Sequence, residues 1–211
     1  MSSLDSVIEN GVIAVLRGLR TDNALNIAKA LIGGGVNTLE ITMETPDALS
    51  IIKNIRTQLG DSVVVGAGTV LDSETARAAI MAGSQFIFSP TVNVETIRIT
   101  KRYGVASVPG AFTPTEILKA YEAGADAVKV FPAGVLGPAY LKDIKGPLPQ
   151  IPLIPTGGIN LENAADFIKS GAIAIGVGGS LVNMKMENSS DFLEDLTKKA
   201  EKFVREVQSA R

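Results

Sequence analysis

Short apolar segments alternate with segments of helical periodicity along the whole chain, with a repeat of roughly 20 to 26 residues. The apolar segments are rich in small and β-branched residues, a composition typical of buried strands. The pattern therefore predicts eight strands, which begin near Val12, Asn37, Val63, Phe86, Val105, Ala127, Pro152 and Ala172.

Segments with helical periodicity follow most of these strands, and several of them end at glycine. Residues 22–32 carry an apolar stripe with a period of about 3.6 residues, and Gly33–Gly35 provide a C-cap signal. Thr113 is an N-cap candidate for the helix that follows it. The helices predicted in this way span residues 22–32, 46–59, 73–82, 114–123, 160–170 and 190–208.

Eight alternations of strand and helix predict an α/β protein with a parallel sheet. The count favours a closed (β/α)8 TIM barrel, and 211 residues is an ordinary length for one such barrel. An open doubly wound sheet is the rival architecture, but Leu16–Arg20 does not match the Gly-x-Gly-x-x-Gly pattern expected after its first strand. No linker interrupts the pattern, so residues 1–211 are expected to form a single barrel domain.

Composition narrows the possible chemistry, because the chain has no cysteine and no histidine. Disulfides and thiol catalysis are excluded, and so are the usual zinc sites. Acid–base chemistry must use Asp, Glu, Lys, Tyr or water, while a carboxylate-only magnesium site stays open.

Charge and hydropathy bear on partners and location. The net charge is −2 and no basic block is present, so no nucleic-acid partner is expected. No segment approaches the ~20 apolar residues of a membrane span, and the first residues lack a signal-peptide core. We therefore expect no membrane contact and a cytoplasmic location.

Lys129 is the most informative polar residue, because it interrupts the apolar run Ala127–Phe131. Side chains alternate along a strand, so Lys129 should face the barrel interior, and Glu40 should do so from the second strand. An amine kept partly neutral by apolar surroundings is a nucleophile that forms a Schiff base with a carbonyl compound. A carboxylate beside it is a candidate general base, and the alternative is a structural ion pair of Lys129 with Glu40.

Other polar and glycine-rich positions fall at the ends of predicted strands, where the active sites of such barrels lie. Arg17 could grip a carboxylate, although a surface role fits it equally well. Gly66–Thr69 offers close backbone approach of a ligand and the Thr69 hydroxyl. Glycine-rich loops after strands seven and eight predict a phosphate site, with unliganded tight turns as the alternative. That site would comprise Thr156, Gly157, Gly158, Gly178, Gly179 and Ser180.

Six motifs occur in order across nearly the whole chain: Ala14–Arg17, Leu39–Thr42, Gly66–Val70, Phe88–Pro90, Val128–Pro132 and Pro155–Gly158. With these motifs the sequence resembles the 2-keto-3-deoxy-6-phosphogluconate (KDPG) aldolases, also called 4-hydroxy-2-oxoglutarate (KHG) aldolases. The resemblance implies a class I aldolase that cleaves KDPG to pyruvate and glyceraldehyde 3-phosphate, with cleavage of 4-hydroxy-2-oxoglutarate to pyruvate and glyoxylate left open.

The resemblance also implies roles for individual residues. Lys129 would form the Schiff base, Glu40 would shuttle protons, and Phe131 and Pro90 would line the pyruvyl end of the substrate. Other members hold the substrate carboxylate with the arginine of a Thr-Leu-Arg-Thr motif, where this chain has Glu44. That contact is therefore expected to move to Arg17, with help from Thr69.

No cofactor or metal is expected, and the resemblance implies a homotrimer. The apolar surface through which the subunits of this trimer meet could lie near residues 86–88 or Phe112. Three alternatives stay open for the substrate and class: a 2-dehydro-3-deoxy-6-phosphogalactonate aldolase, a phosphosugar isomerase, and a non-catalytic sensor of phosphate ligands. Lys129 beside Glu40 argues against the last two.

Overall fold

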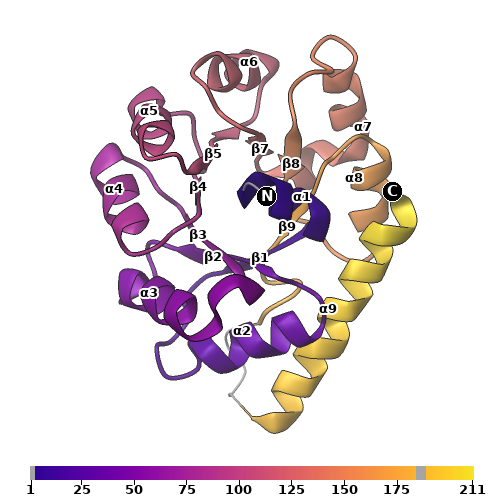
Figure 1. Cartoon of the computed structure of the whole chain (residues 1–211). Helices are drawn as coiled ribbons and strands as arrows, with labels where there is room; N and C mark the ends of the chain where they lie inside the picture. The colour runs from indigo at the N-terminus through magenta and orange to yellow at the C-terminus, as the bar shows by residue number, and fades with distance from the viewer. Residues whose placement is uncertain (1–2, 184–188) are drawn as a thin grey trace.

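The computed structural model describes residues 3–183 and 189–211 and contains a ring of parallel strands enclosed by helices (Figure 1). A six-stranded sheet has the order β5-β4-β3-β2-β1-β9, and a three-stranded sheet has the order β6-β7-β8. The strands are β1 (Val12–Leu16), β2 (Thr38–Thr42), β3 (Val64–Gly68), β4 (Phe86–Phe88), β5 (Ala106–Val108), β6 (Gly110–Ala111), β7 (Val128–Val130), β8 (Leu153–Pro155) and β9 (Ile175–Val177).

Two features close these sheets into one barrel. The chain runs from β5 to β6 through Pro109, whose carbonyl accepts a hydrogen bond from the Lys129 amide. The bridges Leu153↔Ala172 and Thr156↔Gly176 connect β8 to the β9 side. The predicted (β/α)8 barrel is confirmed, and its fifth strand is divided because proline has no N–H to donate to the ladder.

The helices surround this barrel, and the six predicted from periodicity are present with ends shifted by a few residues. The expected Thr113 cap is a complete capping box with Glu116. Periodicity did not indicate α1, α5 or α7, the last of which bends at Gly137 and contains Pro138. The helices are α1 (Ser3–Asn10), α2 (Ala24–Gly33), α3 (Ala48–Leu59), α4 (Ser73–Met81), α5 (Val94–Arg102), α6 (Pro114–Glu122), α7 (Ala133–Lys145), α8 (Ala164–Lys169) and α9 (Ser190–Ala210).

Strand alternation divides the buried apolar residues into two cores. One core lies between strands and helices, and the other fills the barrel, where Phe86 and Phe88 pack with Ile13, Ala127 and Ile154. The expectation of an exposed apolar surface at residues 86–88 is therefore wrong, because these side chains are buried inside the barrel or behind it. Phe112 is exposed, as that expectation requires.

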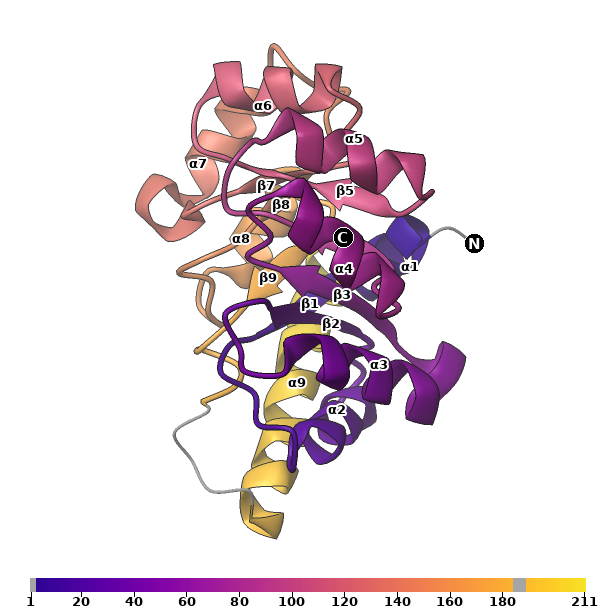
Figure 2. The same cartoon turned by 90° about the vertical axis from the view of Figure 1, so that its left-hand side faces the viewer.

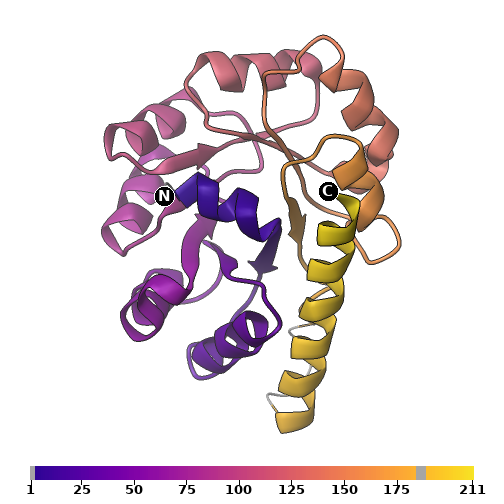
Figure 3. The ribbon, with the colours of Figure 1, turned by 45° about the vertical axis from the view of Figure 1, so that its right-hand side comes forward.

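Helix α1 lies across the amino-terminal end of the strands and closes the barrel there (Figures 1 and 2). Its Val7 is buried against the residues of the barrel interior. Helix α9 runs along the outside beside α2 and α8 (Figure 3), and Gly34 allows the α2 end to approach Ala200. The carboxyl ends of the strands therefore remain as the accessible end of the barrel. In the described residues, no helix has the length and apolar character needed to span a membrane.

Candidate active site

Lys129 and Glu40 face each other inside the barrel from β7 and β2, which lie on opposite sides of the ring. The Lys129 Nζ is 3.6 Å from the Glu40 Oε1, and the two side chains are only 6% and 1% exposed. Alternation along each strand predicts both orientations. Closure of the barrel then brings an amine and a carboxylate together in a buried interior, where charge interactions are weakly screened.

The carboxyl group of Glu40 is buried without direct hydrogen bonds. Within the part of the chain that the structure describes, neither Glu40 oxygen has a hydrogen-bond partner. Burial raises the pKa of Glu40, and the charges of Lys129 and then Arg17 oppose that rise. A raised pKa makes the protonated form of this carboxyl group more available, so that it can donate a proton as well as accept one.

Two aromatic rings enclose the amine. The Lys129 Nζ lies 5.1 Å from the centre of the Phe131 ring and 5.6 Å from that of Phe88. Such rings exclude water, and their faces attract the ammonium form. Phe88 was not among the predicted site residues, although its alternation with Phe86 in β4 was a signal that it points inward.

Glycines in β3 provide the room that this cluster occupies. A Cβ atom at Gly68 would overlap the Glu40 carboxylate, and one at Gly66 would overlap the Phe86 ring. We expected these glycines to admit a ligand, but the space above them is filled by side chains of the protein. Their missing Cβ atoms instead let Glu40 and Phe86 lie flat across β3.

Arg17 and Thr69 lie at the carboxyl end of the barrel. Arg17 follows β1 and forms an ion pair with Glu44, and its side chain is 65% exposed. Thr69 follows β3 and has a left-handed backbone with φ of 57°. Such strained non-glycine residues cluster at functional sites, and the contact of Thr69 with a substrate stays a prediction.

Pro90 lies farther round the same end, where β4 gives way to its loop. Its backbone is packed against Gly110 so closely that a Cβ atom at Gly110 would overlap it. The side chain of Pro90 is half-buried. Pro90 therefore belongs to the rim of the barrel, and its contact with the substrate stays a prediction.

The two glycine-rich loops lie side by side at this end. The Ser180 hydroxyl donates a hydrogen bond to the Ile159 carbonyl, and Thr156 pairs with Gly176. Gly157 and Gly158 have positive φ angles of 84° and 79°, which favour glycine. Sequence reasoning predicted this juxtaposition but not that Ser180 is committed to a bond within the protein.

The rest of these loops leaves polar groups near the barrel interior. The Thr156 hydroxyl is buried without a hydrogen-bond partner in the described residues. Gly178 accepts backbone hydrogen bonds from Leu181 and Val182, while nothing would meet a Cβ atom at Gly179. The loops are therefore joined and open outward, as a phosphate site would require.

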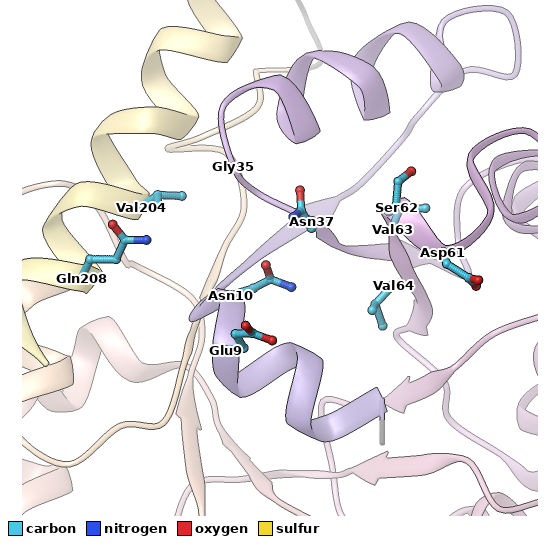
Figure 4. A pocket seen from close by; sticks show the side chains of 10 residues that line it. All are labelled: Glu9, Asn10, Gly35, Asn37, Asp61, Ser62, Val63, Val64, Val204 and Gln208. Atoms are coloured by element: carbon cyan, nitrogen blue, oxygen red, sulfur yellow. The ribbon is translucent and has the colours of Figure 1, made fainter. Parts of the chain in front are cut away.

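A separate cavity of about 410 Å³ lies at the opposite end of the barrel (Figure 4). Its walls include Glu9 and Asn10 of α1 and Gln208 of α9. None of the predicted site residues lines it, and it is separated from Lys129 by the packed barrel interior. Lys129 is therefore not reached from this cavity.

Comparison with known proteins shows the family to which the chain belongs. Residues 4–197 match the family model of the KDPG and KHG aldolases. The 2-dehydro-3-deoxy-6-phosphogalactonate aldolase of Escherichia coli (strain K12) is 39% identical over 171 residues, covering 81% of this chain and 83% of the relative. The 2-dehydro-3-deoxy-phosphogluconate aldolase of Treponema pallidum (strain Nichols) is 37% identical, covering 86% of each chain.

Solved structures of aldolases are also similar to this chain. A structure described as native KDPGal is 36% identical with a TM-score of 0.88, covering 94% of this chain and 95% of that one. The KDPG aldolase of Legionella pneumophila, with pyruvate captured as a covalent carbinolamine, is 27% identical with a TM-score of 0.87, covering 95% and 97%. The chain therefore belongs to the KDPG and KHG aldolase family and is an aldolase, a carbon–carbon lyase.

Proposed function

We propose that the protein is a class I aldolase in which Lys129 forms a Schiff base with a phosphorylated 2-keto-3-deoxy sugar acid. The observation that carries the proposal is the buried approach of the Lys129 Nζ to within 3.6 Å of the Glu40 Oε1. The carbinolamine captured in the Legionella pneumophila relative supports the same chemistry.

In the proposed mechanism, the neutral Lys129 amine adds to the C2 ketone. Glu40 moves protons as the carbinolamine loses water and becomes a protonated imine. Glu40 then accepts the C4 hydroxyl proton, the C3–C4 bond breaks, and its electrons pass into the imine to give an enamine. Glyceraldehyde 3-phosphate leaves, and protonation of the enamine at C3 and hydrolysis release pyruvate and restore the amine.

We assign the remaining predicted residues to substrate binding. Arg17 and Thr69 would hold the substrate carboxylate, and Pro90 and Phe131 would line the pyruvyl end. The joined loops at Thr156–Gly158 and Gly178–Ser180 would bind the phosphate, since such loops expose backbone N–H groups. The substrate would then lie across the barrel end with its ketone above Lys129.

Two epimeric substrates have support. The sequence motifs favour KDPG as the substrate, and activity on 4-hydroxy-2-oxoglutarate stays open. The Escherichia coli relative and the native KDPGal structure support the galactonate epimer as strongly as the motifs support KDPG. We therefore propose cleavage of one or both epimers. Measuring kcat/KM for each, in the wild type and in Lys129→Ala, tests the proposal. Cleavage that depends on Lys129 and survives EDTA supports it, and turnover by the variant would refute it.

We also propose that residues 1–211 act as one aldolase domain that assembles as a homotrimer, as the family resemblance implies. A structure 35% identical to this chain is a cage designed by fusing symmetric oligomeric domains, which agrees with self-association. Light scattering of the purified chain tests this part separately. A mass of three chains is expected, and a monomer at assay concentration would contradict it.

A further inference from the structure

The guanidinium group proposed to hold the substrate carboxylate already has a carboxylate partner in the protein. Arg17 follows β1, Glu44 lies two residues beyond β2, and the two form an ion pair. Their side chains are 65% and 37% exposed, in contrast to the buried pair of Lys129 with Glu40. The Arg17–Glu44 pair can therefore open into solvent without leaving a buried charge.

Hydrogen bonds fix the backbone on both sides of this pair. The Gly18 amide donates to the Thr45 hydroxyl at 3.0 Å, and the Thr42 hydroxyl lies 3.2 Å from that of Thr45. Thr42 also donates to the Leu16 carbonyl at 3.3 Å. The two segments are thus joined directly beside the ion pair, so Glu44 is held within reach of Arg17 while its side chain remains free to turn away.

Both charges also act on the proposed general base. The charge of Arg17 lowers the pKa of Glu40, and the charge of Glu44 raises it. The pair therefore belongs electrostatically to the same end of the barrel as the reactive groups. A second carboxylate arriving at Arg17 would face Glu44 as a competitor, because like charges repel at one guanidinium group.

Building on the proposed function, we propose that Glu44 is the resident counter-ion of Arg17, which the carboxylate of a 2-keto acid must displace. Glu44 is then an affinity-determining residue rather than a catalytic one. Glu44 weakens the binding of every substrate that presents a carboxylate to Arg17, and its charge acts on the bond-making groups only through the pKa of Glu40. An exposed ion pair contributes modestly, so the competition should raise half-saturating concentrations by about 1.5- to 5-fold.

The test uses Glu44→Gln and the dependence on pyruvate concentration of adduct formation with sodium borohydride. Glu44→Gln should lower the half-saturating pyruvate concentration by about 1.5- to 5-fold. Methyl pyruvate has the ketone but no carboxylate, so its half-saturation should not change. In an Arg17→Gln background, Glu44→Gln should have no effect. Glu194→Gln, which removes another exposed ion pair with Lys198 on α9, is the matched control and should behave as wild type.

An unchanged or higher half-saturating pyruvate concentration in Glu44→Gln would overturn the proposal, since Glu44 would then be neutral toward Arg17 or orient it. An equal improvement with methyl pyruvate would also overturn it. These outcomes leave the class I mechanism standing, because the wild type still forms an adduct. Absence of an adduct in the wild type would instead refute the mechanism and the role of Glu44 with it.

Discussion

Gly68→Ala should disable the enzyme while leaving its fold largely intact. Gly68 faces the barrel interior in β3, and an alanine Cβ there would lie 2.5 Å from the Glu40 Cγ and Cδ and still nearer its Oε1. The backbone of Gly68 is that of an ordinary strand, so alanine fits its main chain. The three nearest atoms all belong to Glu40, so relief of the overlap requires this side chain to move from its Cγ outward.

The expected loss follows from the displacement. Relieving the overlap requires the carboxylate to move by about 1 Å or more, and a misplacement of that size costs about 100-fold in rate. Complete loss of general acid–base catalysis, as in Glu40→Gln, sets the limit at about 10²- to 10⁴-fold. We therefore predict that kcat falls by about 100-fold in Gly68→Ala.

Gly66→Ala is the matched control, because the same change two residues earlier meets a different neighbour. Its Cβ would enter the Phe86 ring, which is fully buried and cannot turn aside. Overpacking of this kind costs about 1–3 kcal/mol, and each kcal/mol lowers the melting temperature of a chain this size by about 2–4 °C. Gly66→Ala should therefore lose stability, and its folded fraction should keep most of its kcat.

The assay follows pyruvate release through NADH oxidation by lactate dehydrogenase, and calorimetry gives the melting temperature of each variant. We expect opposite profiles, with Gly68→Ala slow but stable and Gly66→Ala active but less stable. If the kcat of Gly68→Ala lies within about twofold of the wild-type value, Glu40 in its position over β3 is not the group that carries the protons.

Three further predictions concern pH, the loops and a helix cap. Burial raises the pKa of Glu40, so the folded protein holds this proton more tightly than the unfolded chain. The stability this provides is present below the unfolded-state pKa and lost as pH rises through the folded-state pKa. As pH rises between these two pKa values, the melting temperature of wild type should therefore fall relative to that of Glu40→Gln. A difference between the two melting temperatures that stays constant with pH would contradict the raised pKa. Ser180→Ala removes the bond to Ile159, so KM for the phosphorylated substrate should rise about fivefold while half-saturation by pyruvate stays constant, and an equal change in both would argue against a phosphate site. Thr113→Ala breaks the capping box of α6 and should cost about 0.5–2 kcal/mol in thermal unfolding without altering kcat, and an unchanged melting temperature would argue against the cap.

Much of the site could be predicted from the sequence, because strand alternation is a local property. The alternation in Ala127–Phe131 and in β2 is enough to place Lys129 and Glu40 inside the barrel. The count of strands then predicts that they share one interior. Thr113 similarly predicts where its helix begins, because an N-cap acts within a single helical turn.

The remaining features depend on contacts between segments far apart in the chain. The sequence does not tell which side chain fills the space above Gly68, and Glu40 reaches it only across the β2–β3 ladder. The Arg17–Glu44 pair likewise depends on how the loops after β1 and β2 are joined through Thr45. Helix α7 was missed because Gly137 and Pro138 interrupt its pattern, and the backbone is itself non-helical at Gly137.

The central claim is that Lys129 forms a Schiff base with the substrate ketone. The most direct measurement is peptide mass spectrometry after incubation with pyruvate and sodium borohydride, with and without EDTA. We predict one reduced pyruvate adduct on the peptide containing Lys129, formed equally in EDTA and absent from Lys129→Ala. An active enzyme that gives no adduct, or an adduct that persists in Lys129→Ala, would contradict the account and leave Lys129 and Glu40 as a structural ion pair.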